Sequence, residues 1–221
     1  MKRREVIKGL AAFGTMAIFP NITATVNQAN KHLHFVGLGQ GGTNAMVFIH
    51  EKGIKAKYSC ITGRYVSHFT ADMEHLFFET SLEYRVNKIK YKKQIALTPE
   101  MKTIFRENDR YVILTGLGAS VGTGLISNLL EFLQAERKSY LVICSLPSIN
   151  EGRSKRLYAI QKMDELEKLK NVLSIDQQLI AEEIEKPSKP SILKIFEKGD
   201  QQYYNLFKAY YPQIPDQQQF N

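Results

Sequence analysis

The sequence predicts an α/β protein with three layers: a mostly parallel, Rossmann-like sheet with helices on both faces. Strand-like and helix-like segments alternate from residue 33 to residue 210, which is typical of parallel sheets. Two glycine-rich loops, residues 37–45 and 116–124, each follow a strand-like segment and lead into a helix-like one. Ligands of such sheets bind at the carboxyl ends of the strands, so the two loops mark the predicted site.

The expected strands are short runs rich in apolar residues, bounded by glycine, proline or polar residues. The run 140–145, for example, ends just before Pro147. Cys60 and Cys144 lie within two of these runs and are expected to be buried core residues. The expected strands are 33–36, 57–61, 75–79, 111–114, 140–145 and 172–175.

The expected helices carry start, stop or periodic signals. Thr98 offers a hydroxyl N-cap, and Pro99 and Glu100 suit the first turn that follows. Apolar side chains recur along one side of the segment 152–169, at Leu157, Ile160, Leu166 and Leu169. The expected helices are 43–52, 98–107, the segment from the second loop to 136, 152–169, 180–185 and 192–210.

The composition fits one soluble domain. The chain has 221 residues, and we expect the domain to cover residues 31–211, with a flexible tail over 212–221. The formal net charge of +8 is spread over short clusters without a nucleic-acid-binding motif, so no nucleic acid partner is expected. The five histidines lack zinc-ligand spacing, so no metal site is expected from them.

Residues 1–30 are interpreted as an N-terminal leader. Arg3 and Arg4 open a basic start, and no charged residue occurs between Lys8 and Lys31. A basic start followed by a short apolar region is typical of a secretory signal, and the arginine pair resembles the twin-arginine export signal. This interpretation predicts export, with membrane contact only through the leader. The alternative is an amphipathic helix of a cytoplasmic protein.

The first loop contains a dinucleotide-binding fingerprint. Gly37, Gly39 and Gly42 satisfy G-x-G-x-x-G between a strand and a helix, so an NAD(P)-dependent oxidoreductase is one hypothesis. The acid expected after the next strand is replaced by Thr-Gly-Arg at residues 62–64. The second loop has no role in that hypothesis.

The second loop contains a literal G-x-S-x-G pattern around Ser120. A serine hydrolase built on this pattern needs a histidine later in the chain, and the last histidine is His75. The order of residues therefore excludes this class of enzyme.

Taken together, GLGQGGTNA and TGLGASVGTG resemble the GTPase domain of the FtsZ/tubulin superfamily, and its bacterial FtsZ branch in particular. The order of elements agrees, and Pro-Ser-Ile-Asn-Glu-Gly at residues 147–152 resembles the family segment P-F-x-F-E-G. The resemblance covers about residues 33–206. It implies GTP or GDP as the ligand, with Mg²⁺ accompanying the nucleotide.

The same resemblance implies a role for individual residues. Residues of the two loops would line the phosphates, largely through backbone amides, and Glu151 would accept hydrogen bonds from the ribose hydroxyls. Lys155 stands where the family usually has an arginine, and Asp176 stands at or beside the asparagine that reads the guanine edge. The implied nucleotide contacts are Gly39, Gly41, Gly42, Asn44, Gly118, Gly122, Thr123, Gly124, Glu151, Lys155 and Asp176.

The sequence also departs from the family. Ala119, Ser120 and Val121 replace two glycines and a threonine of the second loop, and their Cβ atoms restrict φ and crowd the phosphates. A scaffold that kept the fold and lost nucleotide binding is therefore a further hypothesis. We expect no counterpart of the family's C-terminal domain, whose loop completes a neighbour's GTPase site. We expect a binding or regulatory protein with little hydrolysis alone, and a protein partner such as a full-length relative.

Overall fold

The computed structural model describes residues 33–63, 72–77, 94–108, 110–169, 171–184 and 191–214. The expected leader and most of the expected tail lie outside these residues. The strands are β1 (Leu33–Leu38), β2 (Lys57–Thr62), β3 (Glu74–Phe77), β4 (Arg110–Gly116), β5 (Ser139–Leu146) and β6 (Val172–Asp176). The helices are α2 (Gly39–Glu51), α4 (Pro99–Ile104), α5 (Ser120–Ala135), α6 (Arg153–Leu166), α7 (Gln177–Ile184) and α8 (Ile192–Tyr210), with a 3₁₀ turn, η2 (Ile149–Glu151).

The strands form one sheet in the order β3-β2-β1-β4-β5-β6. Every pair of neighbouring strands is parallel, so the expected mostly parallel sheet is entirely parallel within the described residues. The strand order reverses between β1 and β4, whose register pairs Leu38 with Thr115. This reversal is the topological switch point of a doubly wound sheet, and both glycine loops begin there.

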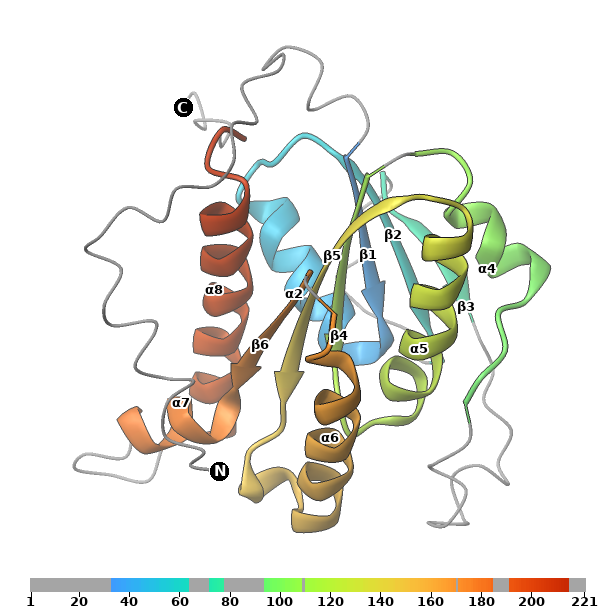
Figure 1. The fold of residues 1–221 in the computed structure, drawn as a ribbon. Helices are drawn as coiled ribbons and strands as arrows, with labels where there is room; N and C mark the ends of the chain where they lie inside the picture. The colour runs from blue at the N-terminus through green and yellow to red at the C-terminus, as the bar shows by residue number, and fades with distance from the viewer. Residues whose placement is uncertain are drawn as a thin grey trace.

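Helices cover both faces of the sheet, which confirms the three layers (Figure 1). On one face, Phe35 and Leu114 of the sheet share an apolar cluster with Met46 of α2, Ile180 of α7 and Phe207 of α8. α4, α5 and α6 pack on the opposite face, around a second cluster. None of the helices in the described ranges combines the length and hydropathy that crossing a membrane requires.

The helix after the first loop begins earlier than the sequence predicts. α2 starts at Gly39 rather than at residue 43, because Gly39, with φ +67°, takes the chain directly from β1 into the helix. The first loop is therefore the first turn of α2. Two short helices also differ from expectation: α4 ends at Ile104, and α7 begins at Gln177.

α8 buries one regular face. Ile195, Gly199, Tyr203 and Phe207, spaced four residues apart, are all buried. The Tyr203 hydroxyl donates to the backbone oxygen of Thr115 at 2.6 Å. This hydrogen bond fixes α8 to β4 at the end of the strand where the second loop begins.

The expected apolar side of α6 is wrong in its first half. Leu157 is 60% exposed, whereas Lys162 and Met163 are buried. Lys162 is accommodated there because its ammonium donates to the Ser127 hydroxyl of α5 at 3.2 Å and pairs with Glu165. Leu166, on the predicted side, is buried as expected. Periodicity alone ranks a lysine as a surface residue, so it misplaced the core contact only at the start of the helix.

A buried polar network lies near the amino ends of the strands, away from the loops. His34 Nε2 lies 2.8 Å from Ser59 Oγ, and that hydroxyl donates to Glu74 at 3.1 Å. The Asn108 amide donates to Nδ1 of His34 at 3.1 Å, so His34 carries its proton on Nε2 and is neutral. Burial, together with the nearby Lys57, lowers the pKa of His34 to about 3.

Candidate functional site

The first loop leads from β1 into α2 without a capping side chain. Leu38 precedes the helix, and the first turn contains no acidic residue. Gln40 and Gly41 are exposed, whereas Gly42 is buried. A Cβ on Gly42 would lie 2.0 Å from the backbone oxygen of Leu114. Packing of α2 on β4 therefore requires glycine at this position, with or without a ligand.

The second loop leads from β4 into α5 and is partly closed by its own residues. Gly118 has φ +88°, and its N–H donates to the Thr123 hydroxyl at 2.8 Å. Ala119 precedes α5 without a capping hydrogen bond, and the first turn contains no acidic residue. Val121 is buried in the apolar cluster around which α4, α5 and α6 pack, whereas Ala119 is exposed. The Val121 side chain therefore packs into the core beneath the loop.

The two loops adjoin at the switch point. A Cβ on Gly39 would lie 3.4 Å from the backbone nitrogen of Gly122. A Cβ on Gly41 would lie 3.6 Å from the Cα of Gly116. Two uncapped helix N-termini therefore lie side by side at the switch point, and both present free amide donors and the positive end of a helix dipole. Ligands of doubly wound sheets bind in the crevice outside the strand ends at this point.

A buried hydroxyl without a partner in the described residues lies beneath the second loop. Thr115 Oγ1 is buried and has no hydrogen-bond partner within the part of the chain that the structure describes. A Cβ on Gly122 would lie 2.2 Å from this oxygen, so the hydroxyl faces the second loop. Buried hydroxyls are normally hydrogen-bonded, so we expect a bound group or a water molecule here.

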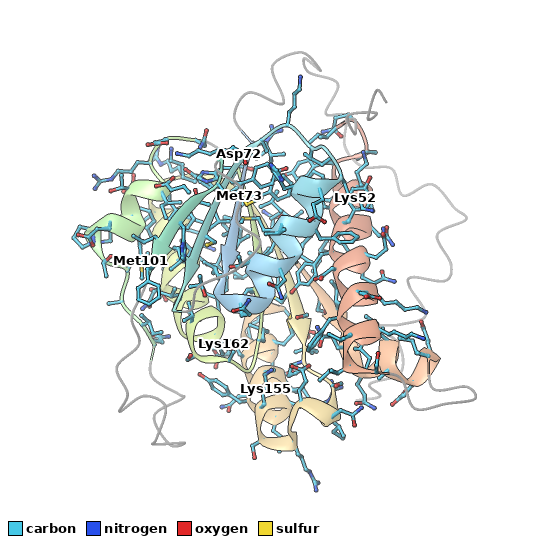
Figure 2. The ribbon with its side chains drawn as sticks, turned by 180° about the vertical axis from the view of Figure 1, so that it is seen from behind. Lys52, Asp72, Met73, Met101, Lys155 and Lys162 are labelled. Atoms are coloured by element: carbon cyan, nitrogen blue, oxygen red, sulfur yellow. The ribbon has the colours of Figure 1, made fainter. Side chains whose placement is uncertain are left out.

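η2 and the start of α6 lie beside the second loop. Glu151 accepts hydrogen bonds from the backbone N–H of Ser148 at 3.1 Å and from the Lys155 ammonium at 2.5 Å. The Cγ of Lys155 would lie 2.8 Å from a Cβ on Gly118. Figure 2 shows Lys155 at the end of the molecule where α2 begins. Lys155 thus brings a positive charge to the second loop, paired in this structure with Glu151.

Asp176 ends β6 and is held by an arginine that the sequence did not identify as a site residue. Arg156 donates from Nη1 and Nη2 to the two carboxylate oxygens at 2.7 and 2.8 Å. Nη1 also donates to the backbone oxygen of Pro147 at 2.7 Å, and the backbone N–H of Gln178 donates to Asp176 at 2.9 Å. The bidentate contact with Asp176 raises the pKa of Arg156. In the sequence, Arg156 was only one member of a basic cluster.

Asn44 lies on the flank of α2. Its side-chain oxygen accepts from Gln40 at 3.2 Å. It also lines a recess of about 230 Å³ between α2 and α8, together with Val47, Phe48, Glu51 and Asp200. Most of these residues lie beyond the first turn of α2 or on α8, so the recess is beside the crevice and not between the loops. Burial raises the pKa of Asp200 to about 7.

The predicted contacts therefore lie along one edge of the sheet, but not all of them have a free backbone amide to offer a ligand. Thr123 and Gly124 lie past the first turn of α5, where backbone amides bond within the helix. Thr123 instead binds the loop through its hydroxyl, and the Gly124 carbonyl accepts from the N–H of Ile95 at 2.8 Å. The free amides of the second loop belong to residues 119–122.

Known structures share this fold. FtsZ from M. jannaschii, solved as an empty dimer, matches at a TM-score of 0.64 with 20% identity, over 89% of this chain and 59% of that one. CetZ1 from Haloferax volcanii, a GDP-bound monomer, matches at 0.61 with 16% identity, over 84% and 62%. TubZ from Clostridium botulinum phage c-st matches at 0.59 with 15% identity, over 82% and 59%.

The sequence matches no protein-family model and no curated protein. The structural likeness shows that this chain has the fold of the FtsZ/tubulin GTPase domain, as the two loops predict. The chain spans about three fifths of the length of each of the three structures.

Proposed function

We propose that the chain binds a guanine nucleotide, GTP or GDP, in the crevice between its two glycine loops. The observation that carries this proposal is the convergence of two uncapped helix N-termini, those of α2 and α5, at the switch point of the sheet. Free amides and helix dipoles together favour a multiply charged anion such as a polyphosphate. CetZ1, which has the same fold, was solved with GDP.

The other proposed contacts lie in order along the same edge. Glu151 follows β5 and would bind the ribose, and Asp176 ends β6 and would face the base. β6 lies three strand spacings from β1, or about 14 Å. This distance is comparable to the length of an extended nucleotide, so one ligand can reach from the loops to Asp176.

Mg²⁺ would fit only as a companion of the phosphates. The unpartnered Thr115 hydroxyl offers one protein oxygen, buried beneath the second loop. Mg²⁺ usually keeps several waters and binds through substrate phosphates with few protein ligands. The ion would neutralise phosphate charge, while the loops hold the nucleotide through their amides.

We propose that the isolated chain hydrolyses GTP slowly at most. The two carboxylates proposed as nucleotide contacts, Glu151 and Asp176, are both paired with basic side chains. Neither is placed as a free base that could activate water. The function that follows is binding or regulation, exerted through a protein partner.

A scaffold without a ligand is the second candidate, and one observation favours it. Several proposed contacts are already bonded within the chain: Gly118 with Thr123, Glu151 with Lys155, and Asp176 with Arg156. A nucleotide has to replace some of these bonds or bind beside them. An NAD(P)-dependent oxidoreductase would share the observed strand order, but β2 ends at Thr62 without an acid for the ribose.

Purification under native conditions tests these candidates together. We expect the folded protein to release GTP or GDP on heat denaturation, alone or beside an adenine nucleotide, identified by mass, and to gain thermal stability from added GDP. A gain with NADP and none with GDP would favour the oxidoreductase. No released nucleotide and no thermal shift with GTP, GDP or NADP would leave the scaffold and reject nucleotide binding.

A further inference from the structure

The bidentate pair between Arg156 and Asp176 uses the part of the carboxylate that a guanine would need. Arg156 contacts both carboxylate oxygens, at 2.7 and 2.8 Å, and the N–H of Gln178 takes a third acceptor position at 2.9 Å. An ionised carboxylate offers about four such positions. One position therefore remains, and it cannot form a second bidentate contact.

Guanine and arginine present the same donor pattern to a carboxylate. Arginine offers two parallel N–H groups in a fixed fork. The guanine edge offers its ring N1–H beside its exocyclic amino group, which is also a pair of parallel donors. Both forks need the two oxygens at once, so only one of them can occupy Asp176 in that geometry.

We propose that Arg156 determines the base selectivity of this site by competing with guanine for Asp176. The inference rests on the proposed nucleotide binding in the crevice. With Arg156 in place, the pair offers guanidinium donors and one free acceptor position. Guanine satisfies this combination through O6 and N1–H, and adenine satisfies it through N1 and its amino group, so the two purines are poorly distinguished.

The surroundings of Arg156 keep it on the carboxylate. Its Nη1 also donates to the backbone oxygen of Pro147 at 2.7 Å, so the guanidinium is held from two sides. Its side chain is 16% exposed and that of Asp176 is 24% exposed, so water screens the pair little. Removing Arg156 frees the bidentate face without removing the acceptor.

The test compares GDP and ADP affinities of the wild-type chain, Arg156→Met and Arg156→Gln. Wild-type protein should bind the two nucleotides within about tenfold of each other. Arg156→Met should bind GDP at least tenfold more tightly than wild type and should not gain affinity for ADP. Arg156→Gln keeps a hydrogen-bond donor without the charge, so its GDP affinity should lie between those of wild type and Arg156→Met. Arg153→Met is the matched control, because Arg153 is exposed on the same helix.

The thermal midpoint and far-UV circular dichroism of each variant confirm folding before titration. An unchanged ratio of GDP to ADP affinity in folded Arg156→Met, or a loss of GDP affinity, overturns the inference while leaving nucleotide binding intact. If neither nucleotide binds to wild-type protein or to any folded variant, the proposed function is overturned as well. If Arg156→Met changes the ratio of GDP to ADP affinity no more than Arg153→Met does, the inference alone is overturned.

Discussion

Gly42→Ala is expected to prevent stable folding of the domain. The new methyl group would lie 2.0 Å from the backbone oxygen and 2.7 Å from the backbone carbon of Leu114. Neither atom can rotate away, because both belong to β4 in the centre of the sheet. α2 would have to move off the sheet, at a cost of about 3 kcal/mol or more. Urea unfolding followed by far-UV circular dichroism measures this loss.

Gly116→Ala is the matched control for this prediction. Its added methyl group would meet Ser145 Oγ at 3.5 Å and Gly41 Cα at 3.8 Å, which are ordinary contacts. Its φ is not in the left-handed region, so the change in unfolding free energy should be about 1 kcal/mol or less. Equal stability of the Gly42 and Gly116 variants would contradict the close packing of α2 on β4.

The second large effect is the pH dependence of stability. It arises from buried His34 and partly buried Asp200, whose pKa shifts act in opposite directions. The pKa of His34 is lowered from 6.5 to about 3, chiefly by burial, so between these values only the unfolded state binds the proton. Stability from this group is complete above pH 6.5 and is lost as the pH falls toward 3. The loss amounts to at most roughly 5 kcal/mol, since each pH unit corresponds to about 1.4 kcal/mol.

Asp200 changes the stability in the opposite direction as the pH rises. Burial raises its pKa from 3.8 to about 7, so between these values only the folded state holds the proton. Its contribution therefore makes the fold less stable as the pH rises from 3.8 to 7, by at most roughly 4 kcal/mol. Between pH 4 and 6.5 the two contributions largely cancel.

Single substitutions should separate the two contributions. In Asp200→Asn the free energy of unfolding should rise with pH between 3.8 and 6.5, because His34 acts alone. In His34→Gln it should fall over the same interval, because Asp200 acts alone. Urea unfolding at half-unit steps of pH measures both slopes. Parallel pH profiles of the two variants would show that neither group titrates as its burial requires.

Much of the fold could be predicted from the sequence because its signals are local. The apolar runs fix the strands, and Thr98 before Pro99 marks the start of α4, where the Thr98 hydroxyl accepts from the N–H of Met101. The two glycine loops predicted the family fold. Glycine is needed there because the chain turns at positive φ at Gly39 and Gly118.

The parts that the sequence did not reveal depend on contacts between distant segments. Arg156 and Asp176 are 20 residues apart and meet because β5 and β6 are neighbours. The burial of Lys162 was not predicted, because nothing local shows Ser127 across the helix interface. The Thr115 hydroxyl looked like an ordinary strand residue, and only the surrounding structure shows that it is buried without a partner.

A calorimetric titration of GDP into the wild-type chain and Gly41→Ala tests the central claim most directly. A methyl group on Gly41 would lie between the two loops, 3.6 Å from the Cα of Gly116, which is an ordinary contact, so the variant should fold normally. The account predicts that wild-type protein binds one GDP and that the variant binds it at least tenfold more weakly. Equal GDP affinity in both folded proteins would place the nucleotide elsewhere, and no binding by wild-type protein would contradict the account.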